Sequence, residues 1–227
     1  MNPAPLSGKR IVLTQSDVFM GPALSTVLQA QGATVIGDTR ALDATGAAAE
    51  LVREAGTVDV LIAHLAVPNP GTAVLDGSED EWRTVFAHMV DPLPRLARAV
   101  LPQMIERRSG KILVMGSASA LRGMKRASSY SAARGAQLAW TQAVGVEMAP
   151  HRIQVNAIAQ NLVENPTYFP PEIQALPKFK ERIKWEMPLG RLVSAEEDAH
   201  FAAYLCSEAA DCFVGQVFPV CGGWVPR

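Results

Sequence analysis

The chain has 227 residues, of which 48% are apolar and 19% are charged, and its formal net charge is −1. These values fit a single globular domain with a large core and exclude a disordered chain. Without a long basic run or a long apolar run, the sequence is expected to have no nucleic-acid surface, membrane span or secretory signal.

Three cysteines lie near the end of the chain, at Cys206, Cys212 and Cys221. Their spacing matches no metal motif and indicates no disulfide framework. We therefore expect reduced thiols in a cytoplasmic protein that binds no metal.

From the N-terminus onward, short apolar runs alternate with longer helical segments. Strands are predicted at residues 10–13, 34–36, 58–63, 111–115, 154–159 and 216–220. Helices are predicted at residues 22–31, 41–55, 79–107, 128–148 and 195–207, with Pro92, Pro94 and Pro102 bending or breaking the third. This alternation predicts an α/β fold: a single doubly wound Rossmann-like domain over residues 1–227, whose parallel β-sheet is flanked by helices on both faces. Such sheets bind ligands at the carboxyl ends of their strands.

Residues 161–188 form the one long connection without a clear helix or strand pattern, and four prolines precede Met187 in it. A connection of this length inside a compact domain is typical of a lid or a binding loop. We therefore expect residues 160–188 to cover a ligand site at the edge of the sheet.

A serine, a tyrosine and an arginine follow the fourth predicted strand. Ser117 lies at the carboxyl end of that strand, and Tyr130 and Arg134 share one face of the next helix. A free tyrosine titrates near pH ~10, and a cation beside it favours the phenolate, so Arg134 is expected to lower the pKa of Tyr130. The phenolate could then take a proton from an alcohol whose oxygen is held by Ser117. The alternative is a surface pair on an ordinary helix, with a serine in a turn.

The first strand-to-helix turn reads TQSDVFMG over residues 14–21 and contains a single glycine. Glycines in this turn allow a pyrophosphate to approach the backbone closely. Phe19 and Met20 would obstruct that approach, and Asp17 would repel the phosphates. Asp38 instead favours dinucleotide binding, because an acidic residue after the second strand can hold the ribose of the cofactor. The alternative is that Asp38 is an ordinary carboxylate in a loop.

The order of elements, the Ser117 and Tyr130 pair and the closing segment GQVFPVCGGW resemble the short-chain dehydrogenase/reductase superfamily over nearly the whole chain. Three features depart from that pattern: the glycine-poor first turn, the segment AHLAVP at residues 63–68, and Arg134 in place of a lysine. Together with the segment AIAQNLVENPTYFP at residues 157–170, these departures resemble the halohydrin dehalogenases, a cofactor-independent branch, and their B-type members most closely.

That resemblance implies a reversible conversion of vicinal halohydrins to epoxides, with release of halide and a proton. The reverse reaction would open epoxides with halide, azide, cyanide or nitrite. Tyr130 would be the base, Arg134 would lower its pKa, Ser117 would bind the substrate oxygen, and no cofactor would be needed. A halide pocket would replace the nicotinamide site, formed by Phe19 and by a turn of Gln160, Asn161, Leu162 and Val163. The alternatives are that Phe19 only fills the core and that the turn is a plain loop after the strand.

The remaining candidates would shape the substrate pocket or support it. Tyr168 and Phe169 are expected to line this pocket; the alternative is that they anchor the loop without touching the substrate. Trp224 is expected to reach it from the same chain or from a neighbouring subunit. His64 and His88 are expected to be structural.

The resemblance also implies a homotetramer, packed through the helices at 79–107 and 128–148, whose ligands are small halohydrins, epoxides and anions. Two other functions stay open from the sequence. One is a divergent NAD(P)-dependent reductase that uses Tyr130 with Arg134. The other is a non-catalytic binding or scaffold protein built on the same fold.

Overall fold

Six parallel strands form one sheet in the computed structural model, which describes residues 4–225. Their order across the sheet is β2-β1-β3-β4-β5-β6, and every neighbouring pair is parallel. The strands are β1 (Arg10–Thr14), β2 (Thr34–Asp38), β3 (Val60–Ala63), β4 (Gly110–Ser117), β5 (Ile153–Gln160) and β6 (Val217–Val220). The order reverses between β1 and β3, and ligands of open α/β sheets bind outside the carboxyl ends of strands at such a point.

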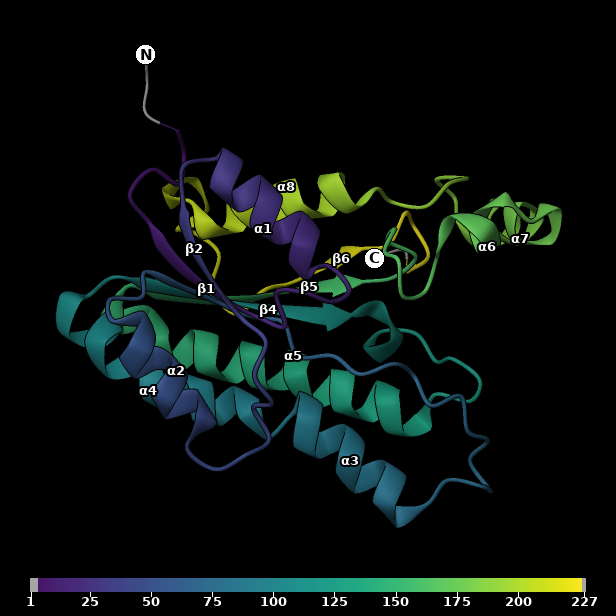
Figure 1. Cartoon of the computed structure of the whole chain (residues 1–227), viewed down its shortest axis with the longest axis horizontal. Helices are drawn as coiled ribbons and strands as arrows, with labels where there is room; N and C mark the ends of the chain where they lie inside the picture. Colours follow the sequence, from purple (N-terminus) through teal and green to yellow (C-terminus); the bar gives the residue numbers. More distant parts are fainter. Residues whose placement is uncertain (1–3, 226–227) are drawn as a thin grey trace.

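Helices cover both faces of this sheet (Figure 1). Two of them lie on one face, and three lie on the other with a fourth packed against them. The first pair is α1 (Gly21–Ala30) and α8 (Ala195–Cys206), and the second group is α2 (Ala47–Ala55), α4 (Pro92–Arg107), α5 (Ser128–Met148) and α3 (Glu79–Met89). The predicted doubly wound fold is confirmed. Strands β3 and β4 are buried over their whole length because both faces are covered.

The region predicted at 79–107 is two helices, and the break falls at Pro92, one of the three prolines that were expected to bend or break it. Ser78 caps α3 by accepting a hydrogen bond from the N–H of Glu81. Pro92 then opens α4 at a position where its missing N–H costs nothing, while Pro102 lies inside α4. Short 3₁₀ turns at Ala118–Ala120, Ala149–His151 and Glu208–Ala210 complete the regular elements.

The predicted helix at 41–55 begins only at Ala47. Gly46 precedes it with a φ of 91°, a conformation that interrupts a right-handed helix. The Arg95 side chain donates to the carbonyl oxygen of Asp43 at 2.7 Å and holds the preceding segment as a loop. The alanine-rich periodicity alone did not indicate this boundary.

The expectation that residues 161–188 are irregular is wrong. The segment contains α6 (Pro171–Ala175) and α7 (Pro177–Glu186), which extend beyond the carboxyl edge of the sheet (Figure 1). Each helix begins with a proline, a residue that stops a helix in its interior but suits its first position. The segment is therefore a helical cover rather than an irregular loop.

Two further expectations concern the described residues. The three cysteines are free thiols, two of them buried. No helix within residues 4–225 is both long and apolar enough to cross a membrane. The predicted domain limits at residues 1 and 227 lie outside the described residues.

Candidate active site

A cavity of about 360 Å³ lies at the carboxyl ends of the strands. The sheet register brings Ser117, the last residue of β4, opposite Gln160, the last residue of β5. Helix α5 runs past the same edge and contributes Tyr130 and Arg134. The cavity is lined by every predicted catalytic, halide-binding and substrate-pocket residue: Ser117, Tyr130, Arg134, Phe19, Gln160, Asn161, Leu162, Val163, Tyr168, Phe169 and Trp224.

Ser117 is oriented by its own turn. Its Oγ accepts a hydrogen bond from the N–H of Ser119 at 3.2 Å and donates to Ser119 Oγ at 3.0 Å. The side chain is buried except for its face on the cavity. Ser117 therefore presents a fixed hydroxyl that could exchange the Ser119 hydroxyl for a substrate oxygen.

Arg134 and Tyr130 are both buried, at 5% and 9% exposure. The Arg134 Cζ lies 5.1 Å from the centre of the Tyr130 ring. Arg134 Nη1 donates to Gln137 Oε1 at 2.9 Å, to Met115 O at 3.0 Å and to Leu65 O at 3.2 Å. None of these acceptors carries a charge, so no carboxylate among the described residues neutralises the guanidinium beside the tyrosine.

The turn after β5 offers two N–H groups. Asn161 N donates to Val220 O at 3.1 Å, and the Gln160 side chain donates to the carboxylate of Asp198. The N–H groups of Leu162 and Val163 make no hydrogen bond to another described residue. Leu162 has a φ of 54°, and such a turn can aim successive N–H groups at one anion. Of the four predicted residues, these two are the available backbone donors.

Asp198 on α8 accepts the hydrogen bond from the Gln160 side chain. It is fully buried on α8, and its Oδ1 has no hydrogen-bond partner among the described residues. Burial raises the pKa of Asp198 to about 7, partly opposed by the hydrogen bond from Gln160. A buried carboxylate therefore holds the side chain of a cavity residue.

Phe19 forms one wall of the cavity. Its φ of 49° turns the chain so that its ring lies 5.7 Å from the Tyr168 ring and 6.1 Å, edge to face, from His64. Aromatic ring edges carry partial positive charge. Phe19 closes the cavity toward the first turn and makes that wall apolar.

Tyr168 makes hydrogen bonds to two segments of the cavity wall, one after β3 and one after β5. Its hydroxyl accepts a hydrogen bond from Asn69 N at 3.1 Å, and its backbone N–H donates to Asn165 Oδ1 at 2.9 Å. Burial, followed by interaction with Tyr130, raises the pKa of Tyr168 to about 12. Tyr168 thus stays protonated near neutrality.

His64 is buried beside Arg134. Its backbone N–H donates to Thr14 Oγ1 at 2.9 Å, and its Nδ1 lies 3.2 Å from Gln15 O, an acceptor that requires a proton on Nδ1. Burial, and then the charge of Arg134, lowers the pKa of His64 to about 4. His64 is therefore neutral and lines the cavity. Its hydrogen bonds connect the segment after β3 to the end of β1. His88 lies away from the cavity and bonds Thr84 O at 2.8 Å.

Trp224 lines the cavity of its own chain. Arg122 Nη1 donates to Trp224 O at 2.7 Å, and the Arg122 Cζ lies 4.6 Å over the indole ring. These contacts place the tryptophan at the cavity of its own chain.

Several cavity residues were not predicted. Asn165 carried a readable signal, because the Asn-Pro dipeptide is typical of a turn, and its side chain positions Tyr168. Arg182 and Glu186 pair on α7, which was not itself predicted, so nothing indicated them. The other unpredicted lining residues are Met20, His64, Ala66, Asn69, Met115, Gly116 and Met124.

The first turn does not fit a dinucleotide. The N–H groups of Val18 and Gly21 bond to carbonyl oxygens inside the turn, so they are not free to hold a pyrophosphate. A Cβ on Gly21 would lie 2.4 Å from Gln15 O, so this glycine serves the packing of the turn itself. Asp38 is buried, bonds to Arg40 and does not line the cavity. Within residues 4–225 no group of acidic, histidine or cysteine side chains could hold a metal ion.

Comparisons with known proteins give two kinds of similarity. A family profile described as enoyl-(acyl carrier protein) reductase matches residues 7–225. The 2-keto-3-deoxy-L-fuconate dehydrogenase of Xanthomonas campestris is 29% identical over 96% of this chain and 81% of its own length.

Two solved structures are similar over nearly their whole length. One, described as a dehalogenation enzyme, has a TM-score of 0.91 and 30% identity, and the match covers 97% of this chain and all of that one. The other is a halohydrin dehalogenase bound to ethyl (2S)-oxiran-2-ylacetate, with a TM-score of 0.88, 25% identity and coverage of 95% and 96%.

Proposed function

The chain belongs to the short-chain dehydrogenase/reductase superfamily, and we propose that it is a halohydrin dehalogenase, an enzyme that closes vicinal halohydrins to epoxides without a cofactor. One observation carries the proposal. Ser117, Tyr130 and Arg134 converge on a cavity that Phe19 closes on the side where a dinucleotide would enter. The similarity to two dehalogenase structures supports it.

In the proposed reaction, the substrate hydroxyl lies between Ser117 and Tyr130. The Tyr130 phenolate takes the hydroxyl proton while Ser117 donates a hydrogen bond to the same oxygen. That oxygen attacks the neighbouring carbon, so a C–O bond forms as the carbon–halogen bond breaks and the halide leaves with its electron pair. The products are an epoxide and a halide, and Tyr130 then returns the proton to solvent.

The leaving halide needs partners that bind a large, diffuse anion. The free N–H groups of Leu162 and Val163 and the ring edge of Phe19 are suited to this, because fixed donors stabilise charge that develops in a transition state. The same pocket would hold azide, cyanide or nitrite for the reverse opening of an epoxide. Neither direction changes an oxidation state, so no nicotinamide takes part.

A divergent NAD(P)-dependent oxidoreductase is the second candidate. It is favoured by the curated relatives, which are dehydrogenases, and by Asp38 at the end of β2. For this function the Phe19 ring would have to leave its place against Tyr168 and His64. The two candidates differ in one property that is easily measured, the requirement for a nicotinamide.

The experiment measures halide release from 1,3-dichloro-2-propanol by purified protein without nicotinamide. Tyr130→Phe should abolish release, whereas Tyr204→Phe, which removes a hydroxyl on α8 outside the cavity, should not. No release by the wild-type protein, together with nicotinamide binding, would replace the proposal with the oxidoreductase. No release and no nicotinamide binding would leave a non-catalytic role.

A further inference from the structure

A fully buried glutamine, Gln137, follows Arg134 on α5. Its Oε1 accepts a hydrogen bond from Arg134 Nη1 at 2.9 Å. Its Nε2 donates to Met89 O at 2.7 Å and to Leu65 O at 3.1 Å. The amide thus joins the arginine to the end of α3 and to the segment after β3. It cannot rotate without breaking buried hydrogen bonds, each of which is costly to lose.

The guanidinium of Arg134 is fixed through one of its nitrogen atoms, Nη1. Nη1 makes the hydrogen bonds of this group to other described residues, which are Leu65 O, Met115 O and Gln137 Oε1. Nε is buried and has no partner among the described residues. Fixing Nη1 therefore fixes the plane of the whole group, whose Cζ lies 5.1 Å from the centre of the Tyr130 ring.

We propose that Gln137 is a positioning residue, which fixes the Arg134 guanidinium beside Tyr130 and thereby sets the pH range in which the site works. The inference rests on the proposed function, in which the Tyr130 phenolate takes the substrate proton. Gln137 does not line the cavity, so it acts only through Arg134. A positive charge held at short range stabilises a phenolate more than one that moves away, because the attraction falls with distance.

Other titratable groups face the same cavity. His64, after β3, is neutral because burial lowers its pKa to about 4. Tyr168, after β5, stays protonated because burial raises its pKa to about 12. Arg182 and Glu186 on α7 pair with each other through two hydrogen bonds. Among the described residues, this leaves Arg134 as a positive charge beside Tyr130 that no carboxylate pairs with.

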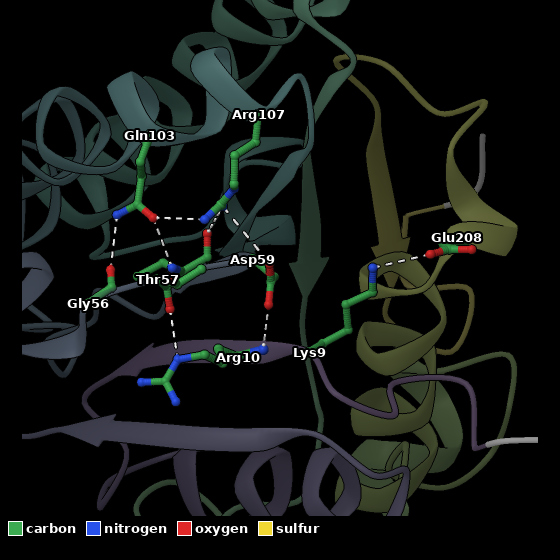
Figure 2. Close-up of polar contacts among 9 residues, drawn as sticks. Lys9, Arg10, Gly56, Thr57, Asp59, Gln103, Arg107 and Glu208 are labelled. Atoms are coloured by element: carbon green, nitrogen blue, oxygen red, sulfur yellow. Dashed lines mark hydrogen bonds and ion pairs between the residues drawn. The ribbon is translucent and has the colours of Figure 1, made fainter.

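A comparable glutamine and arginine lie at the opposite, amino-terminal edge of the sheet (Figure 2). Gln103 Oε1 accepts from Arg107 Nη1 at 3.2 Å and from Val58 N at 3.0 Å, and its Nε2 donates to Gly56 O at 3.1 Å. Neither side chain lines the cavity. Gln103→Met therefore removes the same kind of amide far from the site and serves as the matched control.

The test compares wild-type protein with Gln137→Met, Gln137→Glu and Gln103→Met. Halide release from 1,3-dichloro-2-propanol is measured across the pH range. Ionisation of Tyr130 is followed separately by ultraviolet difference absorbance against Tyr130→Phe. Gln137→Met is expected to lower kcat at neutral pH about tenfold with KM unchanged, and to move both profiles about one pH unit upward. Gln137→Glu should move them further, because a carboxylate neutralises Arg134 directly.

Profiles that stay at the wild-type pH in folded Gln137 variants would overturn the proposal, even if stability falls. An equal shift in Gln103→Met would overturn it as well, since the effect would then be general. If Gln137→Met does not fold, Gln137→Glu decides the question alone. If the wild-type protein releases no halide, the proposed function fails, and the absorbance titration still tests whether Gln137 acts on Tyr130.

Discussion

Replacing Arg134 with methionine removes the charge beside Tyr130 and keeps an unbranched apolar stem. With the 5.1 Å between Cζ and the ring centre as the charge separation, and an effective dielectric constant of about 20, the lost attraction is roughly 3 kcal/mol. An energy of that size corresponds to about a hundredfold in rate. We therefore expect Arg134→Met to slow halide release at pH 7 about a hundredfold. The loss should shrink above pH ~10, where a free tyrosine ionises without help.

The assay is the initial rate of halide release from pH 6 to pH 10.5, with folding checked by circular dichroism at each pH. The fold check matters because Gln137 and Met115 O lose a charged donor, at a cost of about 2 kcal/mol. Arg107→Met, which removes an arginine from the far edge of the sheet, is the control (Figure 2). A loss in Arg134→Met that is equal at every pH would refute the electrostatic role and leave a purely structural one.

Three further predictions concern stability. Because burial lowers the pKa of His64 to about 4, its neutral form stabilises the fold above pH ~6.5, and that stability is lost as the pH falls toward 4. Thermal melts of His64→Gln should therefore depend less on pH over that range, and an unchanged slope would contradict the assignment. Because burial raises the pKa of Asp198 from its usual 3.8 to about 7, its contribution to stability should fall as the pH rises from about 4 to about 7 and level off above 7. Asp198→Asn should remove that fall, so its melting temperature should rise relative to that of the wild-type protein between pH 4 and pH 7, and a difference that stays constant over this range would count against the assignment. Gly21→Ala should destabilise by about 3 kcal/mol in denaturant melts, since its Cβ would meet backbone atoms of the first turn at 2.4–2.6 Å. Gly135→Ala, whose Cβ meets nothing within 4 Å, should be neutral or slightly stabilising, and equal losses in the two would refute the steric argument.

The fold could be predicted from local periodicity, because strand and helix patterns survive where burial is strongest. The helix at Ser128–Met148 was predicted with both of its ends, and all six strands were located within one or two residues of their ends. The errors lie where a tertiary contact competes with the pattern. Arg95 holds the start of the predicted second helix as a loop, and the prolines at 171 and 177 begin helices instead of preventing them.

Many of the residues that line the cavity could be predicted from the sequence, whereas the hydrogen bonds between them could not. Ser117, Tyr130 and Arg134 could be recognised because their chemistry depends on residue type and on spacing along one strand and one helix. Nothing in the sequence showed that the N–H of Asn161 is already used while that of Val163 is free. Such differences depend on which strand or turn lies alongside.

The sequence by itself determined the layered α/β fold, the edge of the sheet where the cavity lies and three of the residues that line it, because period and spacing are local properties of a chain. Only the tertiary structure decided that Phe19 reaches Tyr168 and that Gln137 holds Arg134. The first contact joins residues about 150 positions apart, and no local pattern encodes the direction in which a buried amide points. The physical reason is that hydrogen bonds and ring contacts in a closed cavity are chosen by the packing of every surrounding element at once.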